Sequence, residues 1–287
     1  MKTPVGSSKI EITIVADDLA GPGLRPEHGF ALWIEAAGKR ILFDTGQGDA
    51  LLPNTAALGI DLSTADALVL SHGHYDHTGG VAAVLALAPK ADVYCHPSVV
   101  RERYSITNGT ARQVGMPTQS RAALESLASS KLHLVCDRRA ISPGIGVTGT
   151  IPRVTDYEDT GGPFFLDQGG VTPDPIDDDM ALWLDTPQGP VVCTGCSHAG
   201  LVNTIRFSLR KTGTDTIRAV IGGFHLVNAS AQRLRMTSEE VKGFQPSVVA
   251  PCHCSGQDAT AALVSTLGGI VRPGSSGVRF LFEQEHE

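Results

Sequence analysis

The sequence lacks an excess of basic charge, a long apolar run and a dense set of cysteines. Its 287 residues carry 23 lysines and arginines against 30 aspartates and glutamates, a formal net charge of −7. This balance argues against a general nucleic-acid-binding protein, because a basic surface supplies most of the affinity of that class. No segment approaches the ~20 apolar residues of a membrane helix, and the first residues show no signal-peptide pattern. We therefore expect a soluble cytoplasmic protein that binds neither nucleic acid nor a membrane; its oligomeric state stays open.

The six cysteines are too few for a disulfide framework in a chain of this length. Four of them form two close pairs, Cys193 with Cys196 and Cys252 with Cys254. A structural zinc site is one interpretation of such pairs. The irregular spacing and the apolar runs that lead into both pairs favour the other, in which these are small core residues.

The order of strand-like and helix-like segments predicts one α/β domain over residues 1–287. Strand patterns fill the beginning of the chain and then alternate with helix patterns. Residues 97–165 break this rhythm, and we expect an inserted cap or a set of long loops there. The alternation then resumes, and neither a linker nor a repeat of fixed period divides the chain. Two halves of this kind indicate two sheets packed face to face, with helices on the outer faces.

A histidine-rich loop follows the apolar strand that ends near Leu70. It reads SHGHYDHTGG and contains His72, His74, Asp76 and His77. Imidazole nitrogens and carboxylate oxygens are ligands of zinc, iron and manganese. A turn can aim the first two histidines to one side and the other pair to a neighbouring position, so the loop offers half of the ligands for two adjacent metals. A solvated polar loop is the alternative, which the preceding buried strand disfavours.

Three more histidines stand at the ends of strand-like runs: His198 in TGCSH, His225 in GGFH and His253 in APCH. A half-built metal site needs further protein ligands, so His198 and His253 are the candidates to complete it. His225 would then contact the substrate or donate a proton to a leaving group. A structural histidine with satisfied hydrogen bonds is the competing interpretation of His225.

The HxHxDH motif resembles that of the metallo-β-lactamase superfamily, whose αββα sandwich of two mixed sheets matches the order of segments above. The neighbouring stretches FDTG, TGCSHAGLVNTI, IGGFHL and PCHCSG are similar to those of the 7,8-dihydropterin-6-methyl-4-(β-D-ribofuranosyl)aminobenzene-5'-phosphate synthase-like group. The resemblance implies a binuclear site, with Asp76 both a ligand and a catalytic residue. One metal would be held by His72, His74 and His198, and the other by Asp76, His77 and His253.

The resemblance leaves the ligand between the two metals open. Most of the superfamily places a bridging aspartate after a strand like GPVVCTG, where this chain has GCSH. His198, the thiolate of Cys196 and the acidic run of residues 177–179 are the alternatives, and we favour His198 over Cys196. The resemblance also implies that Asp44, in FDTG, accepts a hydrogen bond from a ligand histidine or from the loop; a plain Asx turn is the other interpretation.

Such a metal pair predicts a hydrolase. Two metals ~3.5–4 Å apart lower the pKa of a bridging water and bind the oxygens of the reacting centre. We expect a metal-bound hydroxide to attack an ester, lactone or phosphoester bond, with zinc as the first choice of metal and manganese or iron as alternatives. The group's name suggests instead a transferase that joins a pterin-methyl diphosphate to an aryl amine ribofuranosyl phosphate. A metal-bearing binding protein without turnover is a third, less favoured hypothesis.

Local charge suggests that the substrate is a small anion. Residues 97–155 contain eight basic and three acidic side chains in a chain that is acidic as a whole. Arginine binds phosphate and carboxylate groups through two parallel hydrogen bonds. Arg101, Arg103 and Arg112 are therefore candidate substrate-binding residues, against the alternative of an ordinary mixed surface.

Overall fold

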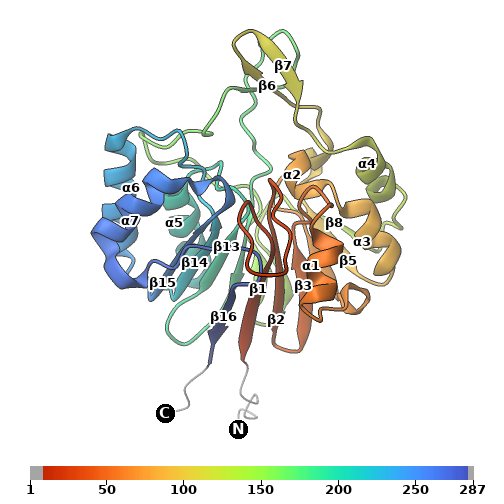
Figure 1. Ribbon diagram of the computed structural model, residues 1–287, viewed down its shortest axis with the longest axis horizontal. Helices are drawn as coiled ribbons and strands as arrows, with labels where there is room; N and C mark the ends of the chain where they lie inside the picture. The colour runs from red at the N-terminus through yellow and green to blue at the C-terminus, as the bar shows by residue number, and fades with distance from the viewer. Residues whose placement is uncertain (1–8, 284–287) are drawn as a thin grey trace.

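Two mixed β-sheets form the centre of the molecule, and helices cover their outer faces (Figure 1). The structure is a computed structural model that describes residues 9–283, so the ends of the expected 1–287 domain lie outside the described residues. Within that range the larger sheet has seven strands in the order β16 (Arg279–Phe282), β1 (Ile10–Ala16), β2 (Ala31–Ala36), β3 (Lys39–Phe43), β4 (Ala67–Val69), β5 (Asp92–Cys95) and β8 (Leu132–Leu134). The second has six described strands in the order β15 (Val248–Cys252), β14 (Ala219–Gly223), β13 (Val191–Thr194), β12 (Ala181–Leu184), β10 (Ile145–Val147) and β9 (Arg139–Ser142).

The central strands are buried on both faces, and successive side chains enter different cores. In β3, Ile41 and Phe43 point into the core between the sheets, whereas Leu42 points to the helical layer. In β14, Ile221 faces the core between the sheets and Val220 faces the helices of the other side. This alternation follows from the two-residue period of a strand. It accounts for the continuous apolar runs in the sequence, which are typical of parallel strands covered on both faces.

Helices lie on both outer faces of the pair of sheets (Figure 1). Leu51, Val84 and Leu124, from three helices, pack on the larger sheet. Ile205, Val241 and Leu263 do the same on the second sheet. The four layers confirm the predicted αββα sandwich. The helix bounds are α1 Leu51–Ala57, α2 Tyr75–Thr78, α3 Val81–Leu87, α4 Thr118–Glu125, α5 Leu201–Thr212, α6 Ala231–Gly243 and α7 Gln257–Leu267, with short 3₁₀ turns at Leu62–Thr64, Pro97–Val100, His253–Ser255 and Gly268–Ile270.

Residues 97–165, expected to be an insert, divide between the sandwich and a smaller cap. Strands β8, β9 and β10 belong to the two main sheets, and α4 packs beside α3. The part that stands apart is a three-stranded sheet of β11 (Phe164–Phe165), β6 (Tyr104–Thr107) and β7 (Thr110–Gln113). Its hairpin β6–β7 rises at the top of Figure 1. We call β6, β7 and β11 the cap.

The helices of the sandwich are short. Within residues 9–283, none combines the length and the apolar character that crossing a membrane requires.

Arg103, at the base of the cap, is a buried anchor, which corrects its prediction as a substrate-binding residue. Its side chain is fully buried and contacts two carboxylates, Asp174 at 3.0 Å and Asp178 at 2.6 Å. The guanidinium also donates to the carbonyl of Ser98 at 3.2 Å. Burial opposes the charged form, but these carboxylates raise the pKa of Arg103 above its usual value. An arginine that two buried acids neutralise is not free to bind an external anion.

We expect Arg103→Met to lower the free energy of unfolding by about 3–5 kcal/mol, because it leaves two buried carboxylates without a counter-charge. Urea denaturation followed by circular dichroism measures this change. Arg101→Ala is the matched control, since Arg101 pairs with Asp177 at the surface and such pairs contribute about 0–1 kcal/mol. Equal destabilisation by the two substitutions would contradict the anchoring role.

Candidate metal centre

The candidate site lies where several strands of both sheets end. Asp44 follows β3, and the histidine-rich loop follows β4 in the larger sheet. In the second sheet, Cys196 and His198 follow β13, His225 follows β14 and His253 follows β15. Each group of strands runs parallel, so its carboxyl ends meet at one edge. The fold therefore gathers residues as far apart in the sequence as Asp44 and His253.

The histidine-rich loop is held in place by a close contact and a buried hydrogen bond. Gly73 passes so close to the backbone of Val99 that a Cβ atom there would overlap with the carbonyl of Val99. Its backbone N–H donates to the carboxylate of Asp178 at 2.8 Å. The single turn of α2 then turns Asp76 and His77 back toward the site. The glycine in HxHxDH thus permits the tight approach that the two flanking histidines need.

Three histidines converge as the first candidate set of ligands. His72 Nε2 lies 2.9 Å from His74 Nδ1, and His198 Nε2 lies 3.2 Å from the same atom. All three side chains are buried, and burial lowers the pKa of each imidazole well below its usual value. They are therefore neutral and can each offer a nitrogen lone pair. The structure brings together the three residues that the resemblance grouped.

Asp76, His77 and His253 form the second set. The Oδ2 atom of Asp76 lies 3.3 Å from His253 Nε2 and 3.8 Å from His77 Nε2. Burial favours the protonated acid, yet the neighbouring imidazoles of His77 and His253 hold the pKa of Asp76 well below its usual value. The two sets are adjacent, because the ring centroids of His72 and His77 are 4.3 Å apart.

The outer nitrogens of these imidazoles define where their protons lie. His198 Nδ1 donates to the Thr160 carbonyl at 2.7 Å, and His253 Nδ1 contacts Asp18 at 2.6 Å. Because the outer nitrogen of His198 carries its proton, the Nε2 lone pair of that ring points into the site. His253 differs, because burial opposes its charged form but Cys254 and the carboxylates of Asp18 and Asp76 raise its pKa well above the usual value. Where two such lone pairs face each other, no hydrogen bond can form and the lone pairs repel. A cation bound between the nitrogens removes this repulsion. The donor atoms therefore fit divalent metals.

Asp44 makes both of the contacts expected of it. Its buried carboxylate accepts from His77 Nδ1 at 2.7 Å, so the His77 Nε2 lone pair also points inward. It further accepts from the backbone N–H of Ser71 at 2.7 Å and from the Ser71 hydroxyl at 2.6 Å. That hydroxyl lies 2.8 Å from His72 Nδ1. One carboxylate thus orients a histidine of each set, directly for His77 and through Ser71 for His72.

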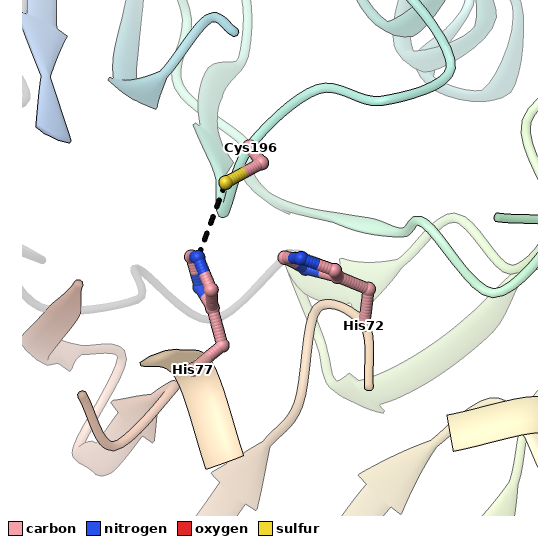
Figure 2. A group of neighbouring side chains, drawn as sticks. All are labelled: His72, His77 and Cys196. Carbon is pink, nitrogen blue, oxygen red and sulfur yellow. Dashed lines mark hydrogen bonds between the residues drawn. The ribbon is translucent and has the colours of Figure 1, made fainter. Parts of the chain in front are cut away.

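Cys196 lies between the two sets. Its sulfur is 3.1 Å from His77 Nε2 and groups with the ligand atoms of His72 and His77 (Figure 2). Figure 2 shows the cysteine reaching down from the loop after β13 toward both imidazoles. The alternatives stated for the central turn are therefore compatible, since His198 joins the first set while Cys196 faces the space between the sets.

The acidic run is bound elsewhere. Asp177 pairs with Arg101 at the surface, and Asp178 is bound to Arg103 and to the Gly73 N–H. Asp179 accepts from the backbone N–H of Ala199 at 2.8 Å, and burial raises its pKa to about 7. Among the described residues, none of the three belongs to a group of ligand atoms that could hold a metal. The run supports the loops around the site.

Backbone strain is concentrated at the same place. Asp44 (φ 60°), Ser197 (56°), His225 (44°) and His253 (46°) adopt the left-handed conformation that side chains disfavour. Each such residue costs on the order of 1–3 kcal/mol unless its surroundings impose the conformation. Four of them at neighbouring strand ends indicate that the chain is bent to aim these side chains.

A cavity of about 390 Å³ opens above the two sets, between them and the cap. Arg112 lines it and stacks over Tyr75, with its guanidinium carbon 4.9 Å from the ring centroid. It also donates to the Tyr75 hydroxyl at 2.9 Å. Arg101 does not line this cavity and pairs with Asp177. Of the three arginines predicted to bind substrate, Arg112 alone faces the cavity.

His225 also lines the cavity and belongs to neither set of the expected ligands. Its ring lies 4.4 Å from that of His198, between centroids, and 6.0 Å from that of Phe164. Its Nδ1 atom is buried without a hydrogen-bond partner. A ring nitrogen of His225 lies within 4.8 Å of the sulfur atoms of Cys196 and Cys254.

Two residues of the site were not predicted from the sequence. His28 lies 3.5 Å from the Asp76 carboxylate and 3.1 Å from Asp18, whose hydrogen bond raises its pKa. Cys254 lines the cavity beside Cys196. The first is a lone histidine in a loop, without a strand before it as a signal. Cys254 belongs to the CHC pattern, but that pattern is also typical of cysteines in a core. Cys193 and Cys252 do lie in the core between the sheets.

Known proteins share this fold. A solved metal-dependent hydrolase of the β-lactamase superfamily, Tm1679, superposes with a TM-score of 0.79 at 27% identity over 94% of this chain and 98% of its own. Two proteins of Methanocaldococcus jannaschii are similar in sequence. One is a 7,8-dihydropterin-6-methyl-4-(β-D-ribofuranosyl)-aminobenzene-5'-phosphate synthase, 29% identical over 86% of this chain and 88% of its own. The other is uncharacterised and 32% identical over 88% and 93%. The family model of the metallo-β-lactamase superfamily matches residues 24–253, and the chain belongs to that superfamily.

Proposed function

We propose that this protein is a binuclear metal-dependent hydrolase that cleaves an ester, lactone or phosphoester bond of a small anionic substrate. The observation that carries the proposal is the pair of adjacent ligand sets beneath a capped cavity. The resemblance to a metal-dependent hydrolase over nearly the whole chain supports it. No protein nucleophile is required in this reaction class, because two bound divalent metals supply both Lewis acidity and an activated water near neutral pH.

The protein's own residues would hold the metals in fixed positions. In the proposal, His72, His74 and His198 bind one metal, and Asp76, His77 and His253 bind the other. Cys196 is the candidate shared ligand, because its sulfur faces both sets. A thiolate is a soft ligand and favours zinc over manganese. Asp44 keeps the rings of His72 and His77 turned inward, a role on which metal affinity commonly depends.

Other residues would act on the substrate. Arg112 supplies a guanidinium at the mouth of the cavity, where it can bind a phosphate or carboxylate through two hydrogen bonds. His225 and His28 lie on opposite sides of the candidate centre, beside His198 and Asp76 respectively. Either imidazole can donate a proton to the departing oxygen, and His225 is our choice because its ring lines the cavity near Phe164.

A second function deserves a test because a relative that aligns over most of the chain is a synthase. In the transferase reaction expected from the resemblance, an aryl amine displaces diphosphate from a pterin-methyl diphosphate. Arg112 would then bind the departing diphosphate, and the rings of Tyr75 and Phe164, which line the cavity, would contact a flat aromatic substrate. The same ligand sets serve both reactions.

We expect about two divalent metals per chain in protein purified without chelators, with zinc predominant. His74→Ala should release at least one of them, because His74 Nδ1 is the atom on which the first set converges. Cys196→Ser should lower the occupancy or the affinity for both metals if its sulfur is shared. Elemental analysis after gel filtration measures each case.

His133→Ala is the control for loss of an imidazole outside the site, since His133 stacks on Tyr94 in the larger sheet. It should keep both metals. A wild-type stoichiometry near zero that added zinc, manganese or iron does not restore would overturn the metal centre.

A panel of phosphodiesters, phosphomonoesters, lactones and thioesters should show hydrolysis that depends on added metal and is lost in His74→Ala. The synthase alternative makes a different prediction, namely pyrophosphate release that requires both the pterin diphosphate and the aryl amine. Pyrophosphate release under those conditions without activity on the panel would replace the hydrolase by the synthase.

Arg112→Ala should raise KM for an anionic substrate about tenfold, or ~1.4 kcal/mol, without changing metal content. Inorganic phosphate should compete with the substrate in the wild type and lose potency in this variant. Arg101→Ala is matched in residue type but lies outside the cavity, so its kinetics should not change. Equal KM values for Arg112→Ala and wild type would remove Arg112 from substrate binding.

A further inference from the structure

Two cysteines that neither ligand set requires to be paired meet at the floor of the cavity. Cys196 follows β13, and Cys254 follows β15, two strands that β14 separates in the sheet. Their sulfur atoms are nevertheless only 3.3 Å apart. The two side chains meet beyond the end of β14, the strand that lies between β13 and β15. Their contact is therefore not one between paired strands.

The contact depends on Gly223, the last residue of β14. A Cβ atom at this position would lie 2.8 Å from the sulfur of Cys254 and 3.3 Å from the Cα atom of Cys196. The nearest atom would be the carbonyl oxygen of Gly195 at 2.3 Å, so any larger residue would force the loop after β13 or the Cys254 side chain to shift. The glycine in GGFH leaves the space in which the two thiols touch.

Both thiols can be reached by a small molecule from the cavity. Cys196 and Cys254 line it together with His225. The other cysteines are placed differently, since Cys193 and Cys252 lie in the core between the sheets and Cys95 lies under the helices. Cys136 is exposed, and no contact between it and another cysteine is seen among the described residues. The pair is therefore distinct among the six cysteines.

We propose that Cys196 and Cys254 are a site of reversible oxidation and form a disulfide with hydrogen peroxide. One thiol attacks a peroxide oxygen, the O–O bond breaks, and a sulfenic acid forms as the first water leaves. The second thiol attacks that sulfur, the S–O bond breaks, and the second water leaves. Two thiols lose two electrons and two hydrogens, and one peroxide becomes two waters. The sulfur–sulfur bond of a disulfide is about 2.05 Å long. Small rotations of the two side chains can bring the sulfurs from 3.3 Å to this distance.

The disulfide would switch off the metal centre. Metal binding requires a thiolate, and Cys196 in a disulfide no longer offers one to the space beside His77. Formation of the bond also draws this sulfur toward Cys254. This consequence rests on the proposed function, whereas the disulfide itself rests only on the position of the two sulfurs.

The test uses the full-length protein, reduced and freed of reductant, then treated with hydrogen peroxide. Free thiols are alkylated under denaturing conditions, and the digest is examined by mass spectrometry, with metal per chain measured in parallel. We expect a peptide linking Cys196 to Cys254, lost on treatment with dithiothreitol. We also expect metal content to fall by at least half on oxidation and to recover after reduction with added zinc.

Cys254→Ala should form no such link and should keep its own untreated metal content under peroxide. Cys252→Ala is the matched control, because that cysteine is two residues away and faces the core; Cys136→Ser serves if the core variant does not fold. Both controls should still form the link.

The outcomes separate the two proposals. If both cysteines are recovered alkylated or as sulfinic acids and no linked peptide is found, the proposed disulfide is wrong, even if the protein binds metal. A metal held by Cys196 and Cys254 together would give that result, with less metal in Cys254→Ala. A linked peptide with unchanged metal content would overturn the switch. A linked peptide in protein that never binds metal would leave the site standing and refute the proposed function.

Discussion

The buried carboxylate of Asp44 is the interaction on which the rest of the site depends. It accepts hydrogen bonds from the backbone and hydroxyl of Ser71 and from His77 Nδ1. These donors determine which nitrogen of each ring keeps its proton, and therefore which lone pairs point inward. A buried carboxylate is costly without compensation, and part of that compensation would come from the positive charge of the bound metals. Asp44 thus both orients the candidate ligand histidines and supplies negative charge beside the candidate metal site.

The two halves of the sandwich meet at this point with almost no space between them. A Cβ atom at Gly195, just after β13 of the second sheet, would overlap with the hydroxyl of Ser71, which follows β4 of the larger sheet and is bound to Asp44. The loop after β13 can therefore bring Cys196 and His198 up to His72 and His74 only because a glycine precedes them. Strained backbone at neighbouring strand ends is the conformational cost of aiming side chains from both sheets at one place.

How far the sequence predicts these features depends on whether the signal is local. The αββα sandwich could be predicted because apolar runs mark the strands, and the two groups of candidate ligands were implied by the resemblance of the HxHxDH motif to that of the superfamily. The extent of the insert could not, because β8 and β10 have three residues each, too few to show a period. Arg103 was assigned to substrate because composition gives charge but not partners; Asp174 and Asp178 are more than 70 positions away. His28 reaches Asp76 from a loop without any pattern.

The cap and the metal loop share a partner, and this bears on how substrate choice can change in such a fold. Asp178 binds Arg103 at the base of the cap with one carboxylate oxygen and the Gly73 N–H of the metal loop with the other. The base of the cap is therefore fixed relative to the candidate ligands. The hairpin beyond it presents Ser105, Thr107 and Arg112 to the cavity, and its strand β7 is exposed along its length. Substitutions on that hairpin meet little packing resistance, so they can alter what the cavity binds while the buried ligands, and the chemistry they support, stay in place.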